Sequence, residues 1–322
     1  MTKTKNAERA ALRNAVEKTA QEMREADGWG MPAEDAALSR VDLHQFGLAV
    51  ALPDLGVVAA AGDSDEHFSI QSISKILSLE LAHEAFGDNL WKRVGREPSG
   101  NPFDTVIDLE QYRGYPRNPL VNAGALVVID MLVSKLGADG TAEAVRRFVE
   151  GQLDEQVAIS EEVIESARHA GDQNRALMHI ARHFNNFDNG PEDVMRPYVL
   201  QCAIELSCRQ LAQLGLFLIP SLPSEPSEAE HRQAARARRI LSLMLTCGMY
   251  DGSGEFAYRT GLPAKSGIGG GILAVVPGQA SIAVWSPGLD EAGNSRLGVM
   301  ALERLSERME WSVFASHRRG KD

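Results

Sequence analysis

The chain has 322 residues, of which 44% are hydrophobic and 24% charged, an ordinary balance for a protein with a packed core. Its formal net charge of −11 argues against nucleic acid as a partner. No apolar run approaches the roughly 20 residues that span a bilayer, so we expect no membrane partner. The three cysteines form no disulfide framework, and the N-terminus lacks the apolar stretch of a signal peptide. We therefore expect a cytoplasmic protein.

Hydrophobic periodicity predicts the first elements of the chain. Apolar residues at helical spacing predict an amphipathic helix over residues 7–26, and glycine and proline interrupt the pattern at 27–33. Two short strands follow at 46–51 and 57–61, joined by a turn of sequence PDLG. A helix is predicted over 68–79, where apolar residues surround a single lysine, as in a helix that is buried on all sides.

The middle of the chain is predicted to be mostly helical, and strands return near its end. Between about 80 and 248 the pattern includes helices at 160–185 and 194–218. Past this region, 274–276 and 281–285 predict a β-hairpin around a Pro-Gly turn, and a final amphipathic helix follows. There is no internal repeat and no long linker.

Strands at both ends with helices between them predict an α+β fold with a single antiparallel sheet. The two ends of the chain build the sheet, and a large helical part is inserted between them. The expected segments are an N-terminal helix at 1–26, a main domain at 27–312 and a polar tail at 313–322, with the sheet drawn from about 42–62 and 255–300 and the helical part from about 68–248.

Ser72 and Lys75 form the pair that carries most of the chemical information. Three residues apart on a helix, they lie on one face, one turn apart, in the Ser-x-x-Lys pattern of serine acyl-transfer enzymes. A buried lysine loses its proton more easily than a solvated one, and its neutral amine can take the hydroxyl proton as the serine attacks a carbonyl. The same tetrad also fits a lysine that extends its charged end to solvent beside an ordinary helix serine.

The stretch 265–271 (KSGIGGG) gives a second signal. Lys265 precedes a predicted strand, as does the Lys-Thr-Gly element of Ser-x-x-Lys enzymes. A phosphate-binding loop requires glycine directly before the lysine, and here that residue is Ala264. The glycines also fit a structural role in tight turns. His179 and His183 have helical spacing, but no glutamate follows His179, so we expect no metal and no other cofactor.

Six segments, taken together and in their order along the chain, carry a resemblance to a known family. They are 68–79 (FSIQSISKILSL), 118–125 (NPLVNAGA), 172–177 (DQNRAL), 198–205 (YVLQCAIE), 247–254 (CGMYDGSG) and 261–267 (GLPAKSG). With these segments the chain resembles the bacterial and mitochondrial type of serine-dependent glutaminase over about residues 27–312.

The resemblance implies a β-lactamase/transpeptidase-like fold and hydrolysis of glutamine to glutamate and ammonia without a cofactor. It implies that Ser72 is the nucleophile and Lys75 its base, and that the backbone N–H of Ile268, where the family usually has valine, helps the Ser72 N–H to bind the oxyanion. It implies substrate contacts at Asn122, Asn174, Tyr198 and Tyr250. One of the two tyrosines is expected to share in proton transfer. The resemblance further implies a homo-oligomer, a dimer or a tetramer.

Two positions depart from the family pattern. Members usually carry a Ser-Glu pair shortly before the helix asparagine, and the glutamate contacts the α-ammonium group of the substrate; here the pair is Ser166-Ala167. An ungapped match places Glu34 where the family has a substrate-facing tyrosine. We hypothesise that the carboxylate has moved and that Glu34 pairs with the ammonium, because an unpaired buried charge costs several kcal/mol. Glu34 also fits an ordinary surface residue.

Two other functions remain as alternatives. Because the ammonium-binding glutamate is missing, the chain also fits a serine amidase or esterase that acts on a different acyl group. A non-catalytic ligand-binding relative with the same fold is an alternative from another class, although the intact Ser72, Lys75 and Lys265 argue against it.

Overall fold

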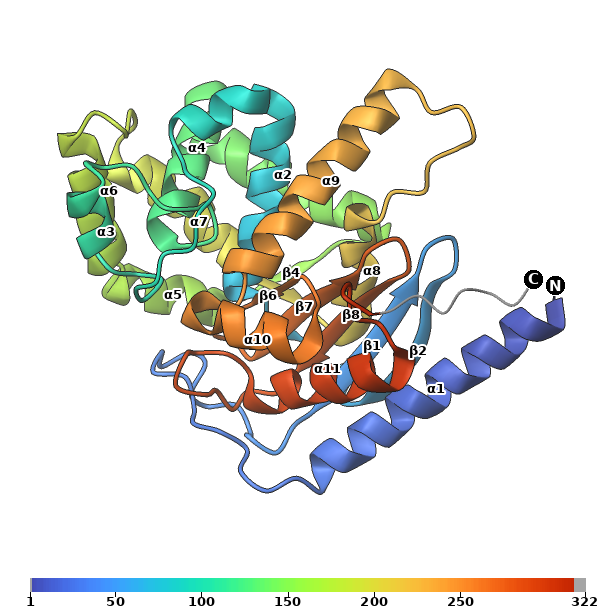
Figure 1. Ribbon diagram of the computed structural model, residues 1–322. Coiled ribbons are helices and arrows are strands. Elements are labelled where there is room, and N and C mark those ends of the chain that lie inside the picture. The colour runs from blue at the N-terminus through green and yellow to red at the C-terminus, as the bar shows by residue number, and fades with distance from the viewer. Residues whose placement is uncertain (1, 316–322) are drawn as a thin grey trace.

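A five-stranded antiparallel sheet forms the centre of the molecule (Figure 1). The structure is a computed structural model that describes the backbone of residues 2–315 and the side chains of 6–167 and 171–315. The strands lie in the order β2-β1-β8-β7-β6. Their bounds are β1 (Gly47–Leu52), β2 (Gly56–Gly62), β6 (Ala264–Ser266), β7 (Gly271–Val276) and β8 (Ala280–Trp285).

The two ends of the chain meet inside this sheet, as the sequence predicts. β1 from the N-terminal part pairs with β8 from the C-terminal part, with Gly47 opposite Trp285. The predicted turn between β1 and β2 is also present, and Asp54 and Gly56 there both have a φ of 63°. Glycine and, less readily, aspartate adopt this left-handed conformation, which is why the turn forms at these residues.

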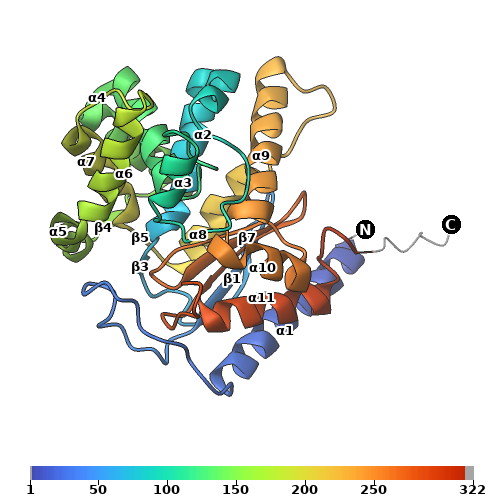
Figure 2. The same ribbon diagram turned by 60° about the vertical axis from the view of Figure 1, so that its left-hand side comes forward.

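The sheet has a hydrophobic core on each face. Successive side chains of a strand point to opposite faces, so neighbouring residues belong to different cores. Leu48 and Val50 pack in a core with α1 (Thr2–Arg24), α10 (Ser253–Thr260) and α11 (Arg296–Met309), whereas Ala49 and Ala51 pack in the core on the other side. Figures 1 and 2 show α1 and α11 side by side below the sheet. The helix predicted at 7–26 is therefore present as α1. Residues 316–322 of the predicted tail lie outside the described residues.

The opposite face carries the helical part of the chain, which Figure 2 shows above the sheet. Its longest helices bury apolar side chains in one continuous core with the sheet. No helix in the described part of the chain is both long and apolar enough to cross a membrane. The helices of this part are α2 (Lys75–Phe86), α3 (Ile107–Gln111), α4 (Asn122–Leu153), α5 (Glu161–Ala170), α6 (Asp172–His183), α7 (Pro191–Cys202), α8 (Cys208–Leu214) and α9 (Glu228–Cys247).

The predictions of continuous helices at 68–79 and 194–218 are wrong, because each range contains a strand of a small second sheet. Its strands, in the order β3-β5-β4, are β3 (Phe68–Ser69), β5 (Ile204–Leu206) and β4 (Ala158–Ile159). Phe68 pairs with Leu206, so this pairing joins parts of the chain that are far apart in the sequence. Local periodicity carries no information about such a partner, which is why apolar strand residues were predicted as helix.

The helix predicted at 160–185 is two helices. α5 ends and α6 begins at Gly171. A Cβ atom at this position would lie 2.8 Å from the Ala167 carbonyl oxygen, so a residue without a side chain suits the close approach between the two helices.

Candidate active site

Ser72 lies in a strained connection between β3 and α2. It belongs to a short 3-10 helix, η1 (Gln71–Ser74), and the α-helix itself begins only at Lys75. Gln71, directly before the serine, has a φ of 47°, a conformation that is uncommon for residues other than glycine. Backbone strain of this kind collects at active sites, where the surrounding packing holds it in place. Here η1 packs against β6 and β7.

Lys75 is buried, with only 1% of its surface exposed. Its Nζ donates hydrogen bonds to the Asn122 Oδ1 (2.6 Å) and to the Leu120 carbonyl oxygen (3.3 Å). Burial lowers the pKa of the Lys75 amine to about 8, while the nearby Cys202 and Asp104 act to raise it. A substantial neutral fraction of the amine therefore exists near neutral pH, which is what a general base requires. The interpretation of Lys75 as a solvent-reaching lysine is wrong.

Asn122 connects three of the predicted site residues. Besides accepting from Lys75, it donates from its Nδ2 to the Asn174 Oδ1 (3.0 Å). The Tyr198 hydroxyl donates to the Asn122 Oδ1 at 3.4 Å. Asn122 is the first residue of α4, Asn174 lies on α6 and Tyr198 on α7. Three helices of the inserted part thus bring these side chains to the lysine.

Tyr250 contacts Ser72 from the side of the sheet. Its hydroxyl donates to the Ser266 carbonyl oxygen (3.3 Å). Burial raises the pKa of the Tyr250 phenol to about 12, and hydrogen bonds with Ser72 and Ser266 act to lower it. Like Gln71, Tyr250 has a positive φ, here 52°. The Ser72 hydroxyl therefore has a polar neighbour in Tyr250.

Lys265 is a second fully buried lysine in the same place. It lies within β6, rather than before a strand as the sequence predicts. Its Nζ donates to the Ser266 carbonyl oxygen (2.6 Å) and lies 4.3 Å from the centre of the Tyr250 ring. Burial, together with the positive charge of Lys75, lowers the pKa of Lys265 well below its usual range. The site thus holds two desolvated amines, and the charge of Lys75 disfavours a proton on Lys265.

Ile268 lies in a turn that presses against the Ser72 segment. A Cβ atom at Gly267 would lie 2.5 Å from the Ile70 carbonyl oxygen, and one at Gly269 would lie 2.6 Å from the Ser69 carbonyl oxygen. Only glycine permits so close an approach of two backbones. The predicted oxyanion donor is therefore held beside the residues that lead into Ser72.

Glu34 makes no hydrogen bond or ion pair with the side chains of this cluster. It is exposed, and no hydrogen bond or ion pair joins it to the described residues. Its neighbour Asp35 is the carboxylate that contacts Ser166, which donates from its Oγ to both carboxylate oxygens (2.9 and 3.0 Å). The role of Glu34 in binding an ammonium group stays a hypothesis.

Phe103 lies on a loop that sequence reasoning did not place at the site. Its ring centre lies 4.4 Å from that of Tyr250 and 5.8 Å from the Lys75 Nζ. The Asn122 N–H donates to the Phe103 carbonyl oxygen (2.9 Å). Proline and glycine near this residue predict a loop, and nothing in the sequence pattern indicates where such a loop packs.

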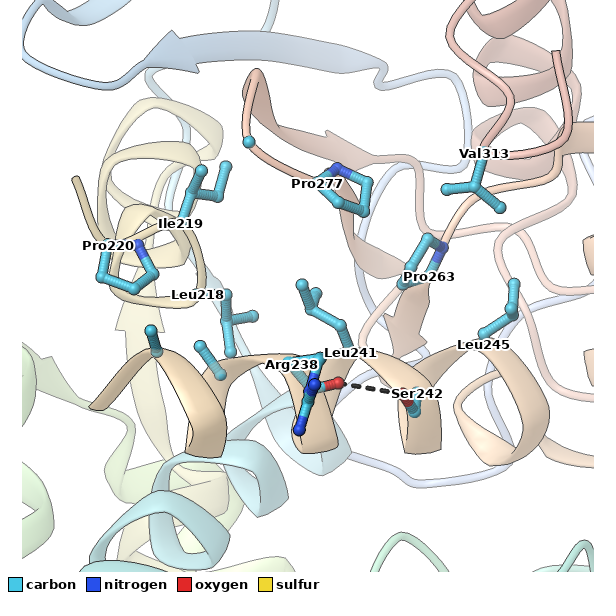
Figure 3. A pocket seen from close by; sticks show the side chains of 13 residues that line it. Leu218, Ile219, Pro220, Arg238, Leu241, Ser242, Leu245, Pro263, Pro277 and Val313 are labelled. Atoms are coloured by element: carbon cyan, nitrogen blue, oxygen red, sulfur yellow. Dashed lines mark hydrogen bonds between the residues drawn. The ribbon is translucent and has the colours of Figure 1, made fainter. Parts of the chain in front are cut away.

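A groove of about 360 Å³ lies elsewhere, between α9 and the turn that joins β7 to β8 (Figure 3). Its lining is mostly aliphatic, and its one hydroxyl side chain, Ser242, already donates to the Arg238 carbonyl oxygen (2.9 Å). Neither Ser72 nor Lys75 lines it. The chemical groups point to the cluster around Ser72 as the reactive site, and the groove offers no nucleophile beside a base.

Comparisons with known proteins agree on one family. Residues 31–314 match the family model described as Glutaminase. A curated glutaminase of Methylobacterium nodulans and one of Rhodopseudomonas palustris are each 50% identical to the chain over 305 residues, which cover 94% of this chain and 98% of theirs.

Solved structures give the same result. A probable glutaminase, YbaS, has a TM-score of 0.87 at 34% identity and covers 95% of this chain and 99% of its own. A probable glutaminase from Bacillus subtilis, complexed with 6-diazo-5-oxo-L-norleucine, has a TM-score of 0.80 at 31% identity, with 93% of this chain and 95% of that chain covered. The α+β fold with an antiparallel sheet is thus confirmed by these neighbours.

Proposed function

We propose that this chain, which belongs to the glutaminase family, hydrolyses L-glutamine to L-glutamate and ammonia. The observation that carries the proposal is the buried Lys75 amine, one turn from Ser72 and bonded to Asn122. The Bacillus subtilis relative is complexed with 6-diazo-5-oxo-L-norleucine, an amino acid whose ketone takes the position of the glutamine carboxamide. This supports a site for an α-amino acid with a carbonyl group at that position.

In the first half of the proposed reaction, the Ser72 Oγ attacks the carboxamide carbon and Lys75 takes the hydroxyl proton. The backbone N–H groups of Ser72 and Ile268 donate to the oxygen that becomes negatively charged. Donors of this kind contribute most where the charge develops, and the loss of one typically costs about 3–4 kcal/mol of transition-state stabilisation. The C–N bond then breaks, the nitrogen takes a proton from Lys75, and ammonia leaves a γ-glutamyl ester on Ser72.

In the second half, water attacks the ester carbon and gives its proton to Lys75. The proton passes to the Ser72 Oγ as the ester bond breaks and glutamate leaves. We assign Tyr250 a share in the proton transfer to and from the Ser72 Oγ, because its hydroxyl contacts Ser72. The Tyr198 hydroxyl contacts Asn122 instead. Covalent catalysis of this kind divides one difficult step into two easier ones.

The test is product formation by the purified protein. We expect glutamate and ammonia in equal amounts from L-glutamine, and far slower release of ammonia from L-asparagine, whose carboxamide lies one methylene closer to the α-carbon. Equal rates on both amides, or no glutamate from glutamine, would contradict the proposal.

The second candidate is a serine amidase or esterase with a different acyl group. Ala167, at the position where the family usually has an ammonium-binding glutamate, favours it. Faster release of alcohol from a simple ester, or opening of a β-lactam, would support this candidate over glutamine hydrolysis. A non-catalytic ligand-binding relative would instead show binding with no covalent labelling of Ser72.

The proposal also includes a homo-oligomer, a dimer or tetramer, acting in the cytoplasm. Both statements rest on resemblance to the family and on the composition of the chain. Light scattering of the purified protein over a range of concentrations tests the first, and a monomer at every concentration would contradict it.

A further inference from the structure

Asp104 lies on the loop that closes one side of the candidate active site. The Asn122 N–H donates to the carbonyl oxygen of the preceding residue, Phe103 (2.9 Å). On the other side, the Gln173 Nε2 donates to the Asp104 carbonyl oxygen (2.9 Å). Asn122 begins α4, and Gln173 is the neighbour of Asn174 on α6. Asp104 is thus held between the two helix ends that carry the asparagine pair.

The charge of Asp104 reaches the reactive groups. Burial lowers the pKa of Lys75 and raises that of Tyr198, and the negative charge of Asp104 raises the pKa of both. The Phe103 ring centre lies 5.8 Å from the Lys75 Nζ, so the residue that follows it, Asp104, begins at the edge of the same site. The ring of Phe103, which packs on Tyr250, fixes the backbone from which the Asp104 side chain extends.

The Asp104 carboxylate has no partner among the described residues. It is half-buried, and no described backbone or side-chain group donates a hydrogen bond to it. The other aspartates near this region are occupied. Asp35 accepts from Ser166 and from the Ala37 N–H, and Asp108 accepts from Ser99 and from Asn101. A half-buried carboxylate with no donor among the described residues is available to accept hydrogen bonds from a ligand.

An L-amino acid substrate supplies such a donor. Its α-ammonium group lies a short methylene chain away from the carboxamide, so a carboxylate that binds it must lie at the edge of the site that holds Ser72. A carboxylate offers an ammonium group both an opposite charge and acceptor oxygens, and Asp104 is a carboxylate beside this site that has no hydrogen-bond or ion-pair partner among the described residues.

We propose that the Asp104 carboxylate binds the α-ammonium group of the substrate and so makes the site specific for amino acids. The inference rests on the proposed glutamine hydrolysis and names the residue that selects glutamine over acyl groups without an amine. Asp104 is here a specificity residue. It takes no part in the proton transfers at Ser72.

The test compares two substrates that differ only in the amine. L-Glutamine carries it, and glutaramate, its desamino analogue, does not. For Asp104→Asn we expect the KM for glutamine to rise at least about tenfold with kcat little changed, because truncation of a hydrogen-bonded charge pair weakens binding strongly. We expect the KM for glutaramate to stay the same or fall. A purely structural defect would lower activity on both substrates alike.

Glu110→Gln is the matched control, since it removes the same charge from an exposed side chain a few residues along the chain. It should leave both substrates unaffected. Glu34→Gln is measured in parallel. If Glu34→Gln raises the KM for glutamine selectively and Asp104→Asn does not, the ammonium partner is Glu34 and our inference is wrong. Equal losses on both substrates, or no change at all, in Asp104→Asn would also overturn it.

A binding measurement separates this inference from the proposed function. Calorimetry gives the Kd of L-glutamate, which keeps the ammonium, and of glutarate, which lacks it, without any turnover. If the wild type releases no ammonia from glutamine but binds L-glutamate in preference to glutarate, and Asp104→Asn removes that preference, the proposed function fails and the inference stands. No preference in the wild type would contradict the inference.

Discussion

The Nζ of Lys75 lies 2.6 Å from the Oδ1 of Asn122. A carboxamide oxygen satisfies a buried amine without bringing the negative charge that would restore its ordinary pKa. Burial therefore remains the largest influence and holds the pKa of Lys75 at about 8. The pairing gives the site a lysine that is anchored in one position and is still able to act as a base.

The first prediction concerns the pH dependence of kcat/KM. The proposed base acts in its neutral form, which is lost as the pH falls below the pKa of Lys75, about 8. We expect kcat/KM for glutamine to rise tenfold per pH unit below that value and to level off above it. A profile that stays flat between about pH 6 and 9 would be inconsistent with Lys75 as the base.

Asn122→Asp should move this profile toward higher pH. A carboxylate 2.6 Å from the Lys75 Nζ favours the charged amine, and an adjacent opposite charge shifts a pKa by about 1–3 units. Activity near neutral pH should fall at least about tenfold and recover in part as the pH is raised. Loss of activity with an unchanged midpoint would mean that Asn122 acts on the substrate alone.

Removal of the Tyr250 hydroxyl should slow the chemical step. For Tyr250→Phe we expect kcat to fall about 100-fold, in the usual range for a group that shares in proton transfer, with a small change in KM. Tyr198→Phe serves as comparison, because its hydroxyl donates to the Asn122 Oδ1 at the long distance of 3.4 Å. A larger loss of kcat in Tyr198→Phe would reverse our assignment of the two tyrosines.

Gly267→Ala should damage the oxyanion site. Its Cβ would lie 2.5 Å from the Ile70 carbonyl oxygen, so the turn that carries Ile268 must move away from the Ser72 segment. We expect a loss of kcat of about 100-fold or more. Gly151→Ala is the control, because a Cβ there meets nothing within 4 Å and alanine suits the interior of α4. It should keep full activity, and comparable losses in both variants would reject the explanation.

Much of the sheet and of the Ser-x-x-Lys pair could be predicted because the signals are local. Strand alternation and turn residues placed β1, β2, β7 and β8, and the apolar surroundings of Lys75 indicated its burial. The strand β5 was missed because its partners β3 and β4 are distant in the sequence. The start of the α-helix was also predicted wrongly. The positive φ of Gln71 and the short 3-10 helix that contains Ser72 precede it, so the α-helix begins only at Lys75.

The contacts that complete the site are also non-local. The hydrogen bonds of Asn122 with Lys75 and Asn174, and the contact of Tyr250 with Ser72, join elements that only the fold brings together. The sequence suggested Glu34 as the carboxylate for the ammonium, because an ungapped match sets it where the family has a substrate-facing tyrosine. We propose Asp104 instead, which lies on a loop whose contacts with Asn122 and Gln173 no sequence pattern reveals.

Ammonia release from L-glutamine by Ser72→Ala, compared with the wild type at equal folded concentration, tests the central claim most directly. Since the substitution removes the attacking atom and little else, we expect the rate to fall by at least about 1,000-fold while the melting temperature stays close to that of the wild type. A Ser72→Ala protein that still releases ammonia within about tenfold of the wild-type rate would show that the serine is not the nucleophile.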